Sequence, residues 1–285
     1  MKMIDFFTEP LQYGFFKRAL ISCVCLAFGS APVGVLLVLR RMSLMGDALS
    51  HAVLPGAAIG YIIAGLSLPI LGIGGFVAGL VVALLAGLVS RYTDLKEDAT
   101  FAGFFLIALA LGVLLISLKH NSVDLIHILF GSALAVDPLS LTIMGSIATL
   151  TLVILALIIR PLLIECFDSS FFKASGGKGA LYHGILLMLV VLNLISGFQA
   201  LGTLLSLGIM MLPAISSRFW GRTLWSMLII SVLFAFLSGF IGLWLSYYQN
   251  WPSGPAIVLI SGFIYILSLF VGPHGSIKNY LKNRK

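Results

Sequence analysis

Long stretches without Asp, Glu, Lys or Arg are the feature that most limits how this chain can fold. The runs 48–90 and 223–277 contain none of these residues, and shorter runs of the same kind lie between them. A bilayer core is crossed by about 20 apolar residues in a helix, so each of these two runs is long enough for two spans. Only 9% of the 285 residues are charged, against about 25% in soluble domains. The sequence therefore predicts an all-α polytopic membrane protein embedded in a lipid bilayer, and it excludes a nucleic-acid partner.

The charge-free runs predict about nine transmembrane helices in a single transmembrane domain that covers residues 1–285. The segment 203–217 is short and contains Gly208 and Pro213; the count becomes eight if it does not cross. The predicted spans are 19–39, two within 48–90 with a break near Leu66–Pro69, 99–118, 138–159, two within 179–217 with a break near Gln199–Thr203, and two within 223–277 separated by Tyr247–Pro252.

The distribution of Lys and Arg predicts the orientation, because these residues concentrate in cytoplasmic loops. With nine spans and a cytoplasmic C-terminus, 13 of the 17 basic residues fall on the cytoplasmic side and four on the other. We therefore expect the N-terminus outside the cell and the C-terminus inside, with 278–285 as a basic cytoplasmic tail. Residues 1–18 are expected to form a short interfacial helix whose Phe15 and Phe16 side chains face lipid, together with Phe6 and Phe7.

Motifs for catalysis are missing from the sequence. It has no G-x-x-x-x-G-K-[ST] phosphate loop, no H-E-x-x-H zinc motif and no G-x-S-x-G elbow. The chain therefore has no evident means of hydrolysing a nucleotide by itself, we expect no catalytic residue, and an intramembrane enzyme has no positive support.

Asp47 and His51 are two ionisable residues that the sequence predicts to lie inside the membrane. Placing an ionisable group there costs free energy on the order of 2.5–3.5 kcal/mol or more, so these residues are candidates for a function. Four residues apart on a helix, they share one face. A carboxylate and an imidazole together suit a divalent first-row ion. Two purely structural interpretations stay open: Asp47 could cap the N-terminus of a helix, and His51 could form a hydrogen bond between helices. Two ligands do not complete a site, but a two-fold dimer with this face on its axis would bring four together.

The stretch 40–56, which reads RRMSLMGDALSHAVLPG, resembles the signature of the membrane subunits of manganese-, zinc- and iron-type ABC importers. Three further segments resemble later family elements, and the likeness covers about residues 10–275. They are Leu129–Ala135, Phe167–Asp168 with Ala174–Gly176, and Leu204–Leu205 with Leu212–Ala214.

The resemblance implies a permease in the bacterial plasma membrane that transports Mn²⁺, Zn²⁺ or Fe²⁺ and binds no permanent cofactor. It also implies a homodimeric or paired permease, two cytoplasmic ATPase subunits and an extracytoplasmic metal-binding protein as partners. The core architecture is expected to be related to that of vitamin B12 and siderophore permeases. Asp47 and His51 fall on the family's metal-contacting positions, and the cytoplasmic loop 160–178 falls on its ATPase-coupling element.

The coupling loop also has a local interpretation. Asp168 is suited to cap a short helix that ends at Gly176, which would present Phe171 and Phe172 to a docking protein or to lipid. The coupling residues predicted in this way and from the resemblance are Phe167, Asp168, Phe171, Phe172, Ala174 and Gly176. The family element is usually more acidic after the Asp than the segment Ser169–Lys173.

A second group of candidate ligands, His120, Asp124 and His127, is spaced i, i+4, i+7 in the outer loop. These residues suit an entry vestibule for the ion, while the alternative is that Asp124 caps a short helix and the histidines are interfacial. Three alternative functions remain: a proton-coupled secondary metal transporter that uses Asp47 and His51 as a relay, an intramembrane hydrolase that uses the same pair, and a cobalamin or siderophore permease.

Overall fold

The computed structural model describes residues 9–65, 67–93, 97–117 and 136–274, and all regular structure within these ranges is helical. After the short 3-10 helix η1 (Pro10–Gln12), the helices are α2 (Gly14–Leu39), α3 (Met45–Ala52), α4 (Leu54–Ala64), α5 (Leu68–Tyr92), α6 (Glu97–Ser117), α8 (Pro138–Phe167), α9 (Ser169–Ala174), α10 (Gly179–Leu201), α11 (Thr203–Ser217), α12 (Leu224–Gln249) and α13 (Ser253–Val271).

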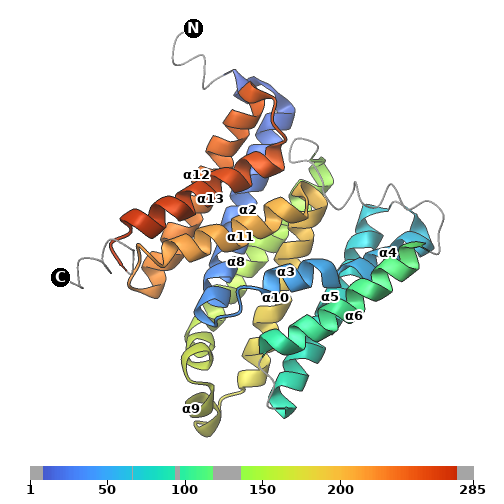
Figure 1. Cartoon of the computed structure of the whole chain (residues 1–285), viewed down its shortest axis with the longest axis vertical. Helices are drawn as coiled ribbons and strands as arrows, with labels where there is room; N and C mark the ends of the chain where they lie inside the picture. The colour runs from blue at the N-terminus through green and yellow to red at the C-terminus, as the bar shows by residue number, and fades with distance from the viewer. Residues whose placement is uncertain (1–8, 66, 94–96, 118–135, 275–285) are drawn as a thin grey trace.

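The helices form two groups that meet at α2 and α10 (Figure 1). In one group α11, α12 and α13 pack on one another and α11 and α12 pack on α2; in the other, α4, α5 and α6 pack together beside α3. Helix α10 contacts α2, α5 and α8 and so connects the groups. The short helix α9 projects at one end of the molecule, beyond the end of α8 (Figure 1).

Each end of α2 contributes to a separate apolar core. Its N-terminal half packs Phe16, Cys23 and Leu26 with side chains of α11 and α12, such as Ile209 and Leu243. Its C-terminal half packs Leu36 and Leu37 with α3 and with a run of α10 that includes Leu186 and Leu194. Because α2 belongs to both cores, it fixes the position of α3, which follows it in the chain.

Glycine allows α4 and α5 to approach closely, as expected of small residues at helix contacts in membranes. A Cβ on Gly56 would lie 2.6 Å from the carbonyl carbon of Gly74 and from the Cβ of Ala78. One turn later, a Cβ on Gly60 would lie 2.9 Å from the carbonyl oxygen of Ile70. Side chains at these positions would push the two helices apart.

The predicted spans correspond closely to these helices. Eight helical segments in the described ranges are long and apolar enough to cross a membrane, and α3 and α4 together make one of them, Met45–Ala64. Helix α11 is apolar but has only 15 residues, so whether it crosses stays a prediction. The predicted all-α polytopic architecture is confirmed.

Two expected boundaries differ from the structure. Helix α2 already begins at Gly14, and the Phe16 side chain, expected to face lipid, is fully buried with its ring centroid 4.8 Å from that of Trp244. Helix α8 runs to Phe167, so Arg160 and Pro161 lie in a helix rather than in a loop. A charged residue limits the apolar core but does not end a helix, because the backbone continues beyond the lipid.

Candidate metal site

Helix α3 presents one packed face and one open face. Met45, Leu49 and Ala52 are buried against the core, whereas the side chains of Asp47 and His51 are 70% and 46% exposed. The N-cap position is occupied by Leu44, with no side-chain cap hydrogen bond, and Asp47 lies in the first turn. The structure therefore gives Asp47 no capping role, and it places both predicted ligands on the open face.

The two predicted ligands lie close together. Asp47 Oδ1 is 3.9 Å from His51 Nε2, and the imidazole ring of His51 lies against Phe105 of α6 at a centroid distance of 5.7 Å. First-row metal ions bind oxygen and nitrogen ligands at about 2.0–2.2 Å. One ion between Oδ1 and Nε2 can therefore reach both atoms with little side-chain movement.

No third protein ligand completes this pair within the part of the chain that the structure describes. No group of three or more His, Cys, Asp or Glu side chains suited to a metal ion occurs there. The predicted vestibule residues His120, Asp124 and His127 lie outside the described residues. Two ligands, both open to the surroundings, form a partial site to which an external group can add ligands.

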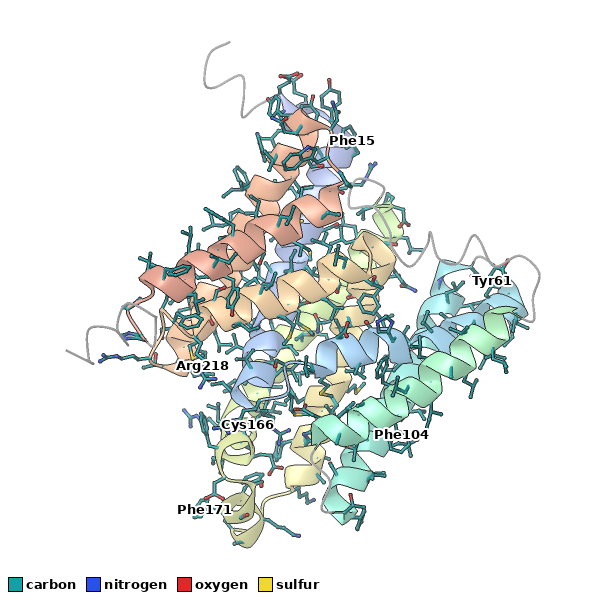
Figure 2. All side chains as sticks on the ribbon, viewed as in Figure 1. Phe15, Tyr61, Phe104, Cys166, Phe171 and Arg218 are labelled. Carbon is teal, nitrogen blue, oxygen red and sulfur yellow. The ribbon has the colours of Figure 1, made fainter. Side chains whose placement is uncertain are left out.

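The predicted coupling residues gather on and around α9. Asp168 caps this helix, since its Oδ1 accepts a 2.8 Å hydrogen bond from the backbone N–H of Phe171, and Gly176 follows the helix with a φ of 81°. Phe171 is 62% exposed and projects from α9 (Figure 2). Phe167 at the end of α8 is also exposed. A short capped helix thus carries an apolar side chain outward.

Phe172 does not share this exposure, contrary to expectation. It is 9% exposed, and its ring packs against Tyr182 of α10 at a centroid distance of 5.7 Å and against Gly177. Helical geometry turns consecutive residues about 100° apart, so Phe171 and Phe172 cannot face the same way. Phe172 attaches α9 to α10, and Phe171 is the outward residue.

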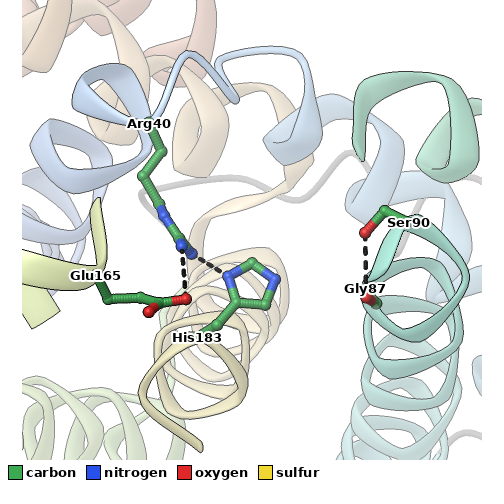
Figure 3. A network of polar contacts seen from close by, with 5 residues as sticks. All are labelled: Arg40, Gly87, Ser90, Glu165 and His183. Atoms are coloured by element: carbon green, nitrogen blue, oxygen red, sulfur yellow. Dashed lines mark hydrogen bonds and ion pairs between the residues drawn. The ribbon is translucent and has the colours of Figure 1, made fainter. Parts of the chain in front are cut away.

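A buried polar cluster that the sequence did not indicate lies behind α9. Arg40 at the end of α2 is bonded to His183 Nδ1 of α10, and its Nη2 lies 3.7 Å from Glu165 Oε1 of α8 (Figure 3). His183 is only 3% exposed. The three residues are far apart in the sequence and form no local motif, so only the fold brings them together.

Comparison with known proteins identifies the family. Residues 12–272 match the model of the ABC 3 transport family. The chain belongs to this family. It is 35% identical over 276 residues to the manganese import system permease protein ScaB of Streptococcus parasanguinis, covering 95% of this chain and 96% of that protein.

Two solved structures have similar folds. PsaBC from Streptococcus pneumoniae in complex with Fab superimposes with a TM-score of 0.84 at 34% identity and covers 99% of this chain and 100% of that one. An inward-facing conformation of a putative metal-chelate type ABC transporter has a TM-score of 0.70 at 18% identity, over 89% and 85% of the two chains. The second likeness concerns the fold alone.

Membership of the family confirms several predictions. The chain is a multi-pass membrane permease subunit of an ABC importer and not an enzyme, and it matches ScaB over nearly the full length of both proteins. Such an importer works with a separate ATPase and a substrate-binding partner.

Proposed function

We propose that this permease imports Mn²⁺ across the bacterial plasma membrane, and that Asp47 and His51 contact the ion on its way. The main support is the arrangement of these two side chains, 3.9 Å apart on the exposed face of a helix whose other face is buried. Oxygen and nitrogen ligands suit Mn²⁺, and they accept Zn²⁺ and Fe²⁺ as well. The name of the relative ScaB favours manganese.

The ion pathway is proposed to lie between two copies of this chain. One copy offers two ligands, and a two-fold axis beside the open face of α3 would supply the same two again. A site assembled from two halves can also be taken apart, and a transport site has to release its ion after each cycle.

ATP-driven motion is proposed to enter through α9. Phe171 offers an exposed apolar side chain to a cytoplasmic ATPase subunit, and the Asp168 cap holds the helix in shape. In this arrangement α9 and the C-terminus are cytoplasmic, the N-terminus is outside, and an extracytoplasmic binding protein delivers the ion from the far side.

Substitution of the two ligands tests this function. Asp47→Ala and His51→Ala are each expected to reduce Mn²⁺ uptake by more than the about 10–100-fold that loss of an outer-shell metal partner costs. Asp98→Ala, at an exposed carboxylate at the start of α6, is the matched control. Normal uptake by both ligand variants, with normal expression, would contradict the proposed site.

The energy source separates this function from a proton-coupled metal transporter that uses the same pair as a relay. Uptake by the reconstituted complex should stop when ATP is withdrawn and should continue when the proton gradient is collapsed. The opposite pattern would favour the relay.

A further inference from the structure

Arg40, His183 and Glu165 form a cluster, here called the Arg40 cluster, which links the helix with the proposed metal ligands to the proposed coupling helix. Arg40 is the residue directly after α2 and precedes the turn into α3, which carries Asp47 and His51. Glu165 lies in the last turn of α8, just before α9 begins at Ser169. A direct ion pair therefore links the start of the metal-binding region to the base of the proposed coupling helix (Figure 3).

The cluster also holds α10 and α5. The carboxylate of Glu165 lies against Gly179, the first residue of α10, where the positive end of a helix dipole favours an anion. His183, one turn further along α10, lies against Gly87 of α5, where a Cβ would be 3.4 Å from His183 Nε2. Four long helices thus meet at this cluster.

The chemistry of the three groups fixes their roles. Arginine carries only donors, so His183 Nδ1 is the acceptor of the hydrogen bond from the guanidinium. Nη2 of the same guanidinium points to Glu165. The planar fork of Arg40 therefore holds two partners at once in a fixed geometry, which the point charge of a lysine cannot reproduce.

Burial favours one fixed arrangement of the Arg40, Glu165 and His183 side chains. The side chains of Arg40 and Glu165 are 10% and 5% exposed, and His183 is 3% exposed. Away from water, a charge that loses its partner is strongly disfavoured, so the cluster tolerates joint movement of its members better than separation.

We propose that Arg40 is a positioning residue for transport, which holds Glu165 and His183 together so that movement of α9 and the end of α8 is passed to α3. The proposal rests on the proposed function, because it takes α9 as the receiver of ATPase motion and α3 as the carrier of the metal ligands. When the end of α8 shifts, Glu165 carries the guanidinium with it, and the turn after Arg40 carries α3 and the Asp47–His51 pair.

The number of Mn²⁺ ions imported per ATP hydrolysed by the complete importer in liposomes tests this role. Arg40→Lys keeps the charge but loses the fork, and Glu165→Gln keeps the shape but loses the charge. Each is expected to lower the ratio by about tenfold, within the range that a coupling free energy between two sites produces, while hydrolysis continues. The matched control is Arg41→Lys, because Arg41 is the next residue, is exposed and is outside the cluster.

A purely structural role would give a different result, in which uptake and hydrolysis fall together, in step with the thermal midpoint. That result, or an unchanged ratio in both variants, overturns the proposal. If Glu165→Gln does not fold, Arg40→Lys decides alone, since it leaves no buried carboxylate without a cation. ATP-dependent uptake by the unsubstituted importer is measured first. If this uptake is absent, the proposed function is refuted. If it is present and the ratio of Mn²⁺ imported to ATP hydrolysed is unchanged in the variants, only the role of Arg40 is refuted.

Discussion

The close contact of α4 with α5 gives a sharp test of how the helix after the metal pair is held. Gly56 faces the backbone of Gly74 so closely that Gly56→Ala would place its methyl group 2.6 Å from the Gly74 carbonyl carbon and from Ala78 Cβ. Both distances are far below van der Waals contact, and the Gly74 carbonyl group belongs to backbone that cannot rotate aside. One of the two helices therefore has to move.

The size of the effect follows from two opposing contributions. Alanine is better than glycine in a helix by about 0.8–1.0 kcal/mol. Overpacking of a tight contact costs about 1–3 kcal/mol. Gly103→Ala in α6 is the matched control, since a Cβ at Gly103 meets no atom within 4 Å. Both variants share the gain in helix propensity, so the difference between them isolates the overpacking cost of about 1–3 kcal/mol.

Thermal unfolding of the two variants in the same detergent measures this difference. At about 2–4 °C per kcal/mol for a chain of roughly this size, Gly56→Ala should unfold about 2–12 °C below Gly103→Ala. Mn²⁺ uptake should also fall in Gly56→Ala, because α4 continues directly from α3. Equal midpoints would show that α4 and α5 do not approach as closely as the structure places them.

Two further predictions concern single side chains at helix ends. Phe171→Ser should weaken co-purification of the ATPase by about tenfold or more, which is the value of burying one aromatic side chain, and it should not change the thermal midpoint. Phe172→Ser, on the buried side of α9, should lower the thermal midpoint instead. An equal effect of both variants on co-purification would contradict the assigned orientations. At the start of α8, hydrogen bonding to Ser140 lowers the pKa of Asp137, so its carboxylate stabilises the fold above the ordinary pKa of about 4 and loses this effect as pH falls through the lowered value. Asp137→Ala should therefore cost about 1 kcal/mol at pH 7 and less in acid; a pH-independent difference would show that the charge contributes nothing.

The spans could be predicted from sequence because their cause is local. A run without charge, such as that containing α12 and α13, has to be helical in lipid, where backbone groups find hydrogen-bonding partners only within the segment. The break at Gly202, with a φ of 96°, was likewise predicted from a short polar interruption between Gln199 and Thr203. The shared face of Asp47 and His51 followed from helical spacing alone.

Contacts between distant segments could not be predicted in this way. Arg40 reads as a loop cation and His183 as an interfacial residue until the fold places them in contact, although 143 residues separate them. Phe16 reads as a lipid anchor until Trp244 covers it. In each case the sequence gives the chemical type of the side chain, and the partner that decides its burial lies on another helix.

Helix α3 is short, and both its ends are fixed by contacts outside the metal pair. Before the start of α3, the Arg40 cluster connects the end of α2 to α8 and α10. After its end, Gly56 allows α4 to contact α5 closely. An eight-residue helix without a side-chain cap has little stability of its own, so its position is set by contacts with the rest of the protein: its buried face against the core and these two anchors at its ends. The anchors are also of different kinds. A glycine contact holds two backbones at one distance, whereas an ion cluster can shift as a unit when α8 moves. Motion should therefore reach α3 from the Arg40 side, with the α4–α5 contact as its pivot. The open face with Asp47 and His51 should then rotate about this contact rather than shift as a whole.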